Sequence, residues 1–317
     1  MNEAHVASIA RELSLRPAQV QAGARLLAEG ATVPFIARYR KEATGTLDEV
    51  ALARVRDRLE QLEELDKRRA AILESLTERG LLTDELKARI AAAATMALLE
   101  DVYLPYRPKR RTRAMIAREK GLEPLARRLF EQANMDPEVE ARAFVDAAKG
   151  VADVGEALAG ARDIVAEWVS EDAPTRSAMR DLFWARGVLR SKVVRGKDVE
   201  GAKFRDYFDK GEPVRSAPSH RVLAVLRGEE EGILKVGIAP PEEEAHRLLE
   251  GRFVRGRGRA SEQVRMAAHE AYERLLGPSV ESETRAIAKE AADGVAIRVF
   301  SENLRQLLMA PPLGAKR

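Results

Sequence analysis

The chain has 317 residues, of which 45% are hydrophobic, 33% charged and 5% aromatic, with a formal net charge of +3, and this length can bury one large core or two smaller ones. It contains no cysteine, which excludes disulfides and cysteine-ligated metal sites. It has no apolar leader and no apolar run of about 18 residues, so we expect a cytoplasmic protein with no membrane partner.

The first two predicted helices cover residues 5–13 and 17–28, separated by three residues. This is the spacing of a helix-turn-helix. Candidate base readers on its second helix are Gln19, Gln21 and Arg25. Almost any helical hairpin offers as much and no basic surround supports the motif, so we do not predict sequence-specific DNA binding here.

Residues 33–47 are predicted to form a loop that mixes aromatic and basic side chains. Such a mixture can hold phosphates with its cations while its rings stack on bases. In the alternative interpretation, Phe35, Ile36 and Tyr39 anchor the loop to the core and the cations pair with neighbouring acids. The candidate phosphate-binding residues of this loop are Arg38, Arg40 and Lys41.

A helix of about 30 residues is predicted to follow, because apolar residues recur there at helical spacing. Thr46 and Glu49 have the spacing of a capping box at its start, and Gly80 suits the left-handed position at its end. If this helix binds a protein partner through its apolar stripe, Leu59 and Leu62 should be exposed.

Four blocks of sequence carry a family resemblance. They are residues 33–49 (VPFIARYRKEATGTLDE), 100–126 (EDVYLPYRPKRRTRAMIAREKGLEPLA), 157–173 (ALAGARDIVAEWVSEDA) and 203–227 (KFRDYFDKGEPVRSAPSHRVLAVLR). Together they resemble the Tex family of bacterial transcription accessory proteins. The resemblance implies the helical N-terminal region of a protein that acts in transcription. It also implies that a ribonuclease-H-like domain, helix-hairpin-helix elements and an RNA-binding barrel belong after this region.

The densest basic cluster follows Tyr106, and Glu119 is the only acid between that residue and Lys120. Pro105 and Pro108 keep its start out of a helix, so its cations should project from a stiff loop. We expect it to be the most cationic surface, in contact with phosphates, and the cations of residues 33–47 are candidates to join it. The alternative is a solvated face paired with acids elsewhere. The candidate binding residues are Arg107, Lys109, Arg110, Arg111 and Arg113.

The rest of the chain is predicted to be helical with one exception. Successive helices are expected over residues 122–192, and a second basic stretch covers residues 186–197. Residues 222–226 are apolar on both faces and residues 234–238 alternate, so we predict that they form the two strands of a β-hairpin. Residues 280–309 then read as a second long helix.

The predicted fold is therefore mainly α, an elongated multi-helix array with long helices and one small β-hairpin. We expect helix-turn-helix-like helices, the signature loop and a long helix in residues 1–80, and a helical bundle with the basic loop in residues 81–205. The hairpin and further helices, ending in a long helix, should occupy residues 206–310. Residues 311–317 are expected to be a truncated linker towards an absent ribonuclease-H-like domain.

No catalytic motif was found in the sequence, neither a phosphate-cradling glycine loop nor a metalloprotease or hydrolase signature. His246 stands near Glu242, Glu243 and Glu244, but the helix dipole already explains a glutamate-rich first turn. We therefore expect no enzyme activity, no metal site and no cofactor. The expected function is non-sequence-specific binding of RNA or DNA in transcription. The alternative is a protein-interaction scaffold for the transcription machinery, with no nucleic-acid contact of its own.

Overall fold

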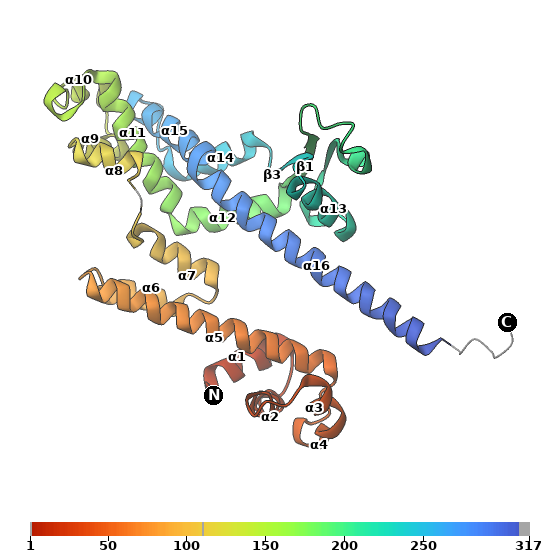
Figure 1. Ribbon diagram of the computed structural model, residues 1–317. Helices are drawn as coiled ribbons and strands as arrows, with labels where there is room; N and C mark the ends of the chain where they lie inside the picture. The colour runs from red at the N-terminus through yellow and green to blue at the C-terminus, as the bar shows by residue number, and fades with distance from the viewer. Residues whose placement is uncertain (1, 110, 311–317) are drawn as a thin grey trace. The chain divides into compact units, whose positions relative to one another are not determined.

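A computed structural model describes residues 2–109 and 111–310 (Figure 1). Helices dominate these residues, and their one sheet has three strands, which confirms the prediction of a mainly α fold with a little β structure. Two compact units are present, Met1–Arg107 and Pro108–Arg317. The finer division at residues 80 and 205 stays a prediction. Arg110 and the predicted linker, residues 311–317, lie outside the described residues.

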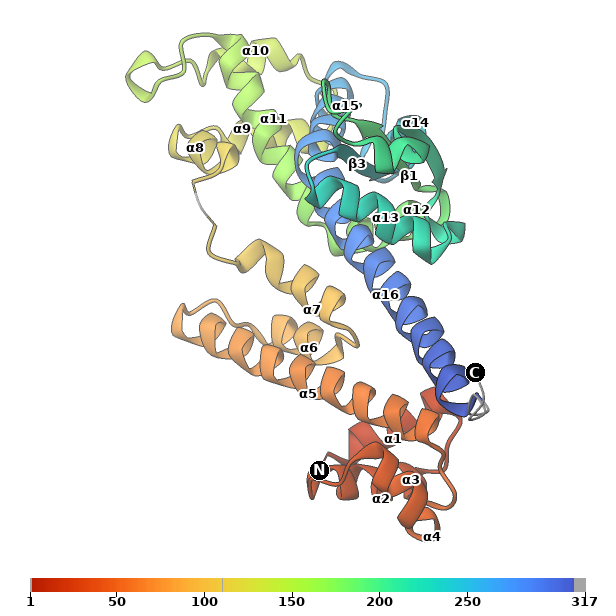
Figure 2. The same ribbon diagram turned by 45° about the vertical axis from the view of Figure 1, so that its right-hand side comes forward.

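The first unit is organised along one 30-residue helix, α5. Three helices pack on its first half and two on its second half (Figures 1 and 2). The helices are α1 (Glu3–Leu13), α2 (Pro17–Ala28), α3 (Val33–Tyr39), α4 (Lys41–Thr44), α5 (Glu49–Glu78), α6 (Asp84–Ala92) and α7 (Met96–Tyr103). The apolar stripe of α5 is buried in two stretches. Leu52 and Val55 belong to the first stretch, and Ile72 and Leu76 belong to the second. Leu62 is buried and Leu59 is half-buried, which counts against a free apolar docking stripe on α5.

The two ends of α5 differ in how well the sequence predicted them. Asp48, not Thr46, is the N-cap, because its Oδ1 accepts a hydrogen bond of 2.7 Å from the amide of Ala51. Thr46 has a left-handed φ of +66°, so the predicted capping box is wrong. At the other end Gly80 has a φ of +63° and the amide of Leu81 bonds the carbonyl of Leu76, which confirms the predicted Schellman stop.

In the second unit a helical bundle surrounds α11, whose buried residues include Ala157, Ala161 and Ala166. Its helices are α8 (Arg113–Glu119), α9 (Glu123–Glu131), α10 (Pro137–Arg142), α11 (Val154–Glu171), α12 (Ala173–Arg186), α14 (Glu242–Phe253) and α15 (Arg259–Ala271). Gly160 of α11 allows close packing, since a Cβ there would lie 2.4 Å from Leu122 Cδ1. The bundle therefore depends on small residues where its helices meet.

Beside the bundle lies an antiparallel sheet in the order β2 (Asp209–Pro213), β1 (Val188–Val193) and β3 (Leu234–Ala239). Leu189 on the central strand pairs with Glu212 on one side and Ile238 on the other. Helices α13 (Ser219–Glu230) and α16 (Gly277–Met309) pack on it (Figure 2). The 33 residues of α16 confirm the second predicted long helix.

The predicted location of the β-hairpin is wrong in its first strand. Residues 222–226 belong to helix α13, and β3 pairs with β1 instead. Val222, Val225 and Leu226 are buried at helical spacing on one face of α13. Gly228 then lets β3 approach, because a Cβ there would lie 2.6 Å from Leu234 Cδ1. A short apolar run is compatible with the helical period and with a buried strand. Here the run forms a helix because one face of it packs on the sheet.

Side chains of α16 cover the outer edge of β3. The amide of Ile238 donates to Glu281 Oε1 at 3.0 Å, and Arg285 Nη2 donates to the carbonyl of Val236 at 2.9 Å. These two backbone groups would otherwise be free to pair with another strand. Among residues 2–109 and 111–310, no helix combines the length and the apolar character that a membrane span requires.

Candidate nucleic-acid interface

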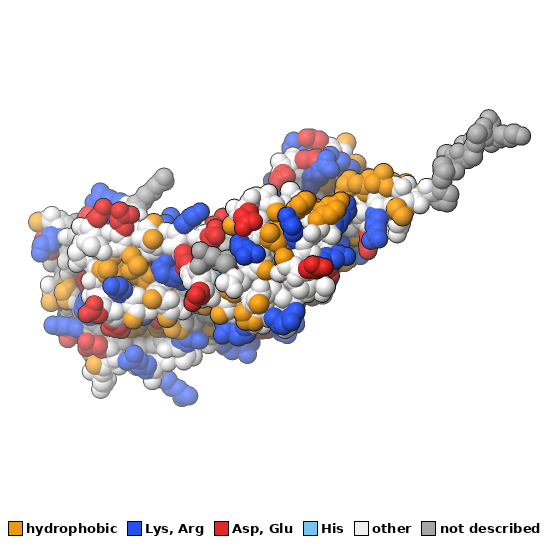
Figure 3. All heavy atoms as spheres, turned by 90° about the horizontal axis from the view of Figure 1, so that it is seen from below, with side chains coloured by type: hydrophobic (Ala, Val, Ile, Leu, Met, Phe, Trp, Pro, Cys, Tyr) orange, Lys and Arg blue, Asp and Glu red, His pale blue; other side chains and the backbone are white. Residues whose placement is uncertain are grey.

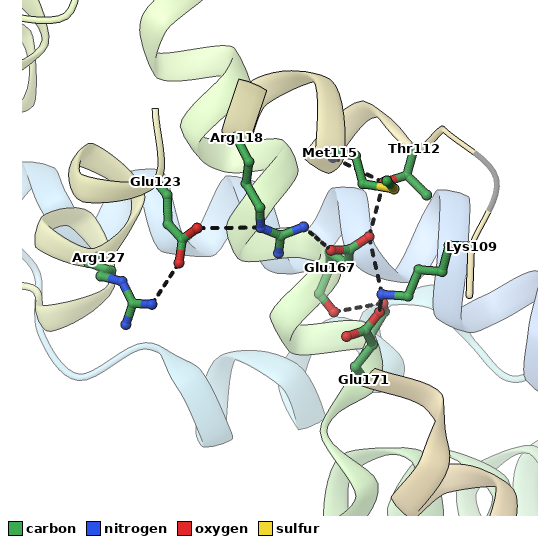
Figure 4. Close-up of polar contacts among 9 residues, drawn as sticks. Lys109, Thr112, Met115, Arg118, Glu123, Arg127, Glu167 and Glu171 are labelled. Atoms are coloured by element: carbon green, nitrogen blue, oxygen red, sulfur yellow. Dashed lines mark hydrogen bonds and ion pairs between the residues drawn. The ribbon is translucent and has the colours of Figure 1, made fainter. Parts of the chain in front are cut away.

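Lys109, the first described cation of the predicted cluster in the second unit, is held against α11 (Figure 4). Its ammonium group contacts the carboxylate of Glu171 and lies 3.5 Å from Glu167 Oε1. The Lys109 side chain is 22% exposed and that of Glu167 only 7%. The predicted exposure of Lys109 is therefore wrong, because acids more than 50 positions away in the sequence neutralise it.

Glu167 also fixes the start of α8 (Figure 4). Thr112, the N-cap of α8, donates its hydroxyl to Glu167 Oε1 at 3.1 Å and accepts the amide of Met115. Arg118 Nη1 donates to the other oxygen, Oε2, at 2.6 Å. A buried carboxylate is tolerated when cations and hydrogen bonds surround it. These contacts therefore hold α8 against α11.

The carboxyl group of Glu171 in this network has a raised pKa. Burial raises its pKa above the usual range, the nearby ammonium of Lys109 opposes that rise, and the charge of Glu167 adds to it. The net increase means that burial of the anion outweighs its pairing with Lys109.

Three other described cations of the predicted cluster are exposed, namely Arg107, Arg111 and Arg113. Arg111 Nη2 lies 2.8 Å from Glu119 Oε2, but the two side chains are 70% and 55% exposed, so water screens this pair strongly. No ion pair joins Arg107 or Arg113 to any residue that the structure describes. Charge remains accessible at these two positions.

The predicted loop at residues 33–47 is mostly helical, because Pro34 occupies a first turn and α3 and α4 follow one another. Ile36 is fully buried, but Phe35 and Tyr39 are 44% and 70% exposed. Their ring centroids lie 5.3 Å apart, and the Arg40 guanidinium lies 5.9 Å from the Phe35 ring. The anchoring interpretation therefore holds for Ile36 and is wrong for Phe35 and Tyr39.

Three cations accompany these rings on α3 and α4. Arg38, Arg40 and Lys41 are all exposed. Arg38 Nε lies 3.7 Å from Glu49 Oε1, and both side chains are more than half exposed, so this pairing is weak. Two exposed rings and three exposed cations thus lie within seven residues, on two consecutive helices of one unit.

Arg107 does not join this group within the first unit. Ile36 of α3 packs in the cluster that contains Leu52, near the start of α5. The segment before Arg107 is held at the other end, where Arg79 Nη1 donates to the carbonyl of Tyr106 at 2.6 Å. A 30-residue helix is about 45 Å long, so Arg107 lies far from Arg38, Arg40 and Lys41. The expectation that the cations after Pro108 join those three stays a prediction.

The sheet presents cations that the sequence alone did not bring together. Arg190 and Lys192 are exposed on the outward face of β1, and the buried residues Leu189 and Ser191 alternate with them. Lys192 lies opposite Lys235 of β3 and Asp209 of β2. The basic stretch at residues 186–197 signalled the first two cations, but only the strand register adds Lys235.

The charges on the face of the molecule drawn in Figure 3 are mixed. On the face drawn in Figure 3, Lys and Arg side chains stand among Asp and Glu side chains rather than in one continuous patch. A phosphate contact on this face would therefore be local, at small groups of cations.

The predicted helix-turn-helix spacing is present in α1 and α2. Gln19, one of the candidate base readers, is occupied inside the protein. Its Oε1 accepts the amide of Arg16 at 3.2 Å, and its Nε2 donates to the carbonyl of Gly45 at 2.8 Å. Gln21 and Arg25 are exposed. The structure therefore assigns Gln19 to capping α2 and leaves two candidate side chains for base reading.

Comparisons with known proteins give the relatives of this chain. The transcriptional accessory protein Tex of Neisseria gonorrhoeae is 43% identical over 314 residues, which cover 96% of this chain and 41% of the relative. Protein tex of Bordetella pertussis is 44% identical over 325 residues, covering 98% and 41%. The human S1 RNA-binding domain-containing protein 1 is 29% identical over 307 residues, covering 91% and 30%. The chain thus spans about two fifths of the length of these bacterial relatives.

Two family models match the chain in consecutive order. The Tex-like protein N-terminal domain matches residues 3–77, and the Tex central region-like model matches residues 132–300. The second match alone covers more than half of the chain, so the chain belongs to the Tex family of transcription accessory proteins.

Proposed function

We propose that this chain contributes non-sequence-specific contacts to RNA or DNA within a protein that assists transcription. The proposed role is binding rather than catalysis. Its principal site is the group on α3 and α4, which we call the aromatic-cation group: Phe35, Arg38, Tyr39, Arg40 and Lys41. Arg107, Arg111 and Arg113 are proposed as secondary phosphate contacts.

One observation carries the proposal, the joint exposure of Phe35 and Tyr39 beside three cations. Large aromatic side chains are normally withdrawn from water, so two exposed rings one helical turn apart call for a partner. Bases offer aromatic faces to such rings, and phosphates offer charge to the cations around them.

The names of two relatives also support a nucleic-acid contact in transcription. One is named a transcriptional accessory protein and another an S1 RNA-binding domain-containing protein. Those names describe proteins more than twice as long as this chain, so a nucleic-acid contact by this chain itself is our proposal.

The test is a fluorescence anisotropy titration of labelled single- and double-stranded RNA and DNA at two salt concentrations. The triple variant Arg38→Glu/Arg40→Glu/Lys41→Glu should weaken binding across all sequences and flatten the salt slope by about one unit per lost phosphate contact. The matched control is Lys67→Glu/Lys87→Glu/Arg89→Glu, which makes the same charge change on exposed faces of α5 and α6.

Equal losses in the two triple variants would mean that net charge, not this site, governs binding. The alternative function, a scaffold for the transcription machinery, predicts a different outcome. Aromatic residues also serve protein interfaces, so a salt-tolerant complex with a protein partner that requires Phe35 and Tyr39, together with no nucleic-acid binding, would support the scaffold instead.

A further inference from the structure

Three metal-ligand side chains converge where α14 meets the helix that follows it. Glu242 and His246 lie one turn apart on α14, and Glu273 lies in the π-helical turn Tyr272–Leu276 that connects α15 to α16. One ligand atom from each of the three side chains lies within 4.8 Å of the other two. Glu242 and Glu273 are exposed, and His246 is partly buried.

The imidazole of His246 has an unused nitrogen. Its Nε2 is buried and has no hydrogen-bond partner among the residues that the structure describes. The nearest carboxylate oxygen, Glu242 Oε1, lies 3.9 Å away, too far for a hydrogen bond. Buried polar atoms are nearly always partnered in native proteins, so this nitrogen calls for a ligand.

The ring of His246 is held in place from two sides. It stacks on His269, with centroids 3.8 Å apart and an interplanar angle of 7°, and meets the ring of Tyr272 edge-on at 5.5 Å. His269 is itself fixed by a 2.7 Å contact between its Nε2 and Glu250 Oε1. Neighbours that fix the orientation of an imidazole are a regular feature of metal sites.

The negative charge of the cluster comes from its two carboxylates. Neither Glu242 nor Glu273 forms an ion pair with a Lys or Arg in the described part of the chain. The site therefore carries negative charge without a compensating side chain.

The backbone at Glu273 is also irregular. The amide of Gly277 donates to the carbonyl of Tyr272, five residues back, and a Cβ on residue 277 would lie 2.6 Å from that carbonyl oxygen. Gly277 thus permits a π turn at the point where Glu273 reaches α14. Such π turns inside helices are frequent at functional sites.

We propose that Glu242, His246 and Glu273 bind one divalent transition-metal ion, of the class of Zn²⁺ or Co²⁺. One imidazole nitrogen and two carboxylate oxygens suit these ions, whereas Mg²⁺ and Ca²⁺ prefer oxygen ligands alone. In a tetrahedral site, ligand atoms about 2.0–2.2 Å from the ion are about 3.3–3.6 Å from one another. The three ligand atoms lie within 4.8 Å of one another, so the two exposed glutamate side chains need to close each separation by at most about 1.5 Å. The ion would link α14 to the start of α16, a role separate from nucleic-acid binding.

The test begins with the whole chain, freed of metal by a chelator that is then removed. Titration calorimetry with Zn²⁺ should give one ion per chain and an increase in Tm, because binding to the folded state alone stabilises it. Co²⁺ should produce visible absorption bands, and Mg²⁺ at the same concentration should leave Tm unchanged. Absence of saturable Zn²⁺ binding overturns the proposal.

Two variants locate the ion. Glu273→Gln removes an exposed ligand and should weaken Zn²⁺ binding at least about tenfold. Glu243→Gln changes an exposed glutamate that is next to Glu242 in the sequence but outside the cluster, and should bind as the unaltered chain does. His246→Ala should abolish the Co²⁺ bands. Equal affinities in Glu273→Gln and Glu243→Gln, or unchanged bands in His246→Ala, would place the ion elsewhere and refute the site.

Discussion

The ammonium group of Lys109 contacts the carboxylate of Glu171, which lies 62 positions later in the chain. With Glu167 and Arg118 this pair forms a network that joins α8 to α11. A basic segment at the start of the second unit is thereby attached to the centre of the helical bundle. Its positive charge is used for stability at Lys109 and remains accessible at Arg113.

Lys109→Glu should destabilise the protein strongly. The substitution places a third carboxylate beside Glu167 and Glu171, and breaking a buried ion pair costs about 3–5 kcal/mol. Arg113→Glu, at an exposed position without an ion pair among the described residues, should change the free energy of unfolding by no more than about 0.5 kcal/mol. Urea denaturation followed by circular dichroism measures both, and similar values for the two variants would contradict the assignment of Lys109.

Glu171→Gln should change how stability depends on pH. Because the pKa of Glu171 is raised in the folded protein, its contribution is fully present below the ordinary glutamate pKa of about 4.3 and is lost as the pH rises through the raised value. The stability of the unaltered chain relative to the variant should therefore fall as the pH rises from the ordinary glutamate pKa through the raised one. Thermal unfolding at a series of pH values tests this, and a difference that stays constant or grows would refute it.

Phe35→Ala/Tyr39→Ala should weaken the binding of single-stranded RNA. Stacking on one aromatic side chain contributes about 1–3 kcal/mol, so loss of two rings should lower affinity at least about tenfold without changing the salt slope. The fold should survive because Phe35 is 44% and Tyr39 70% exposed. Val50→Ala, also at an exposed apolar position of the first unit, is the control; an equal loss there would exclude stacking as the cause.

Gly228→Ala should destabilise the second unit despite the higher helix propensity of alanine. The new methyl group would lie 2.6 Å from Cδ1 and 2.9 Å from Cγ of Leu234, which is buried, and overpacking of this kind costs about 1–3 kcal/mol. Gly251→Ala on α14 has no atom within 4 Å of the new Cβ and should stabilise the helix by about 0.5–1 kcal/mol. The denaturation midpoint should fall in Gly228→Ala and rise in Gly251→Ala, relative to the unaltered chain. A higher midpoint in Gly228→Ala would contradict the close packing.

Local sequence signals were sufficient for the long helices. The end of α5 depends on one residue, Gly80, whose left-handed φ the pattern anticipated. The start of α5 was misplaced by two residues because Thr46 and Asp48 both have side chains that can cap, and the left-handed backbone at Thr46 decides between them. Such a choice depends on the preceding turn, which sequence spacing does not describe.

Interactions between distant parts of the chain explain the larger misses. Residues 222–226 of α13 were predicted to be a strand because their apolar run fits both a helix and a strand. Only the packing of Leu234 against this helix, which the sequence does not show, distinguishes the two. The exposure of Lys109 was overestimated because counting charges nearby in sequence cannot detect Glu167 and Glu171. Glu273 was not connected to His246 for the same reason, since only the folded chain brings α14 and the π turn together.

The side chains of Glu281 and Arg285 occupy the hydrogen-bonding positions that a fourth strand would use on β3. The sheet is therefore closed to growth on this side, and a foreign β-segment cannot extend it there without first displacing α16. On the opposite side β2 is short and ends in Pro213, which cannot donate a backbone hydrogen bond. This small sheet is thus protected at both margins against the edge-to-edge association that leads to aggregation.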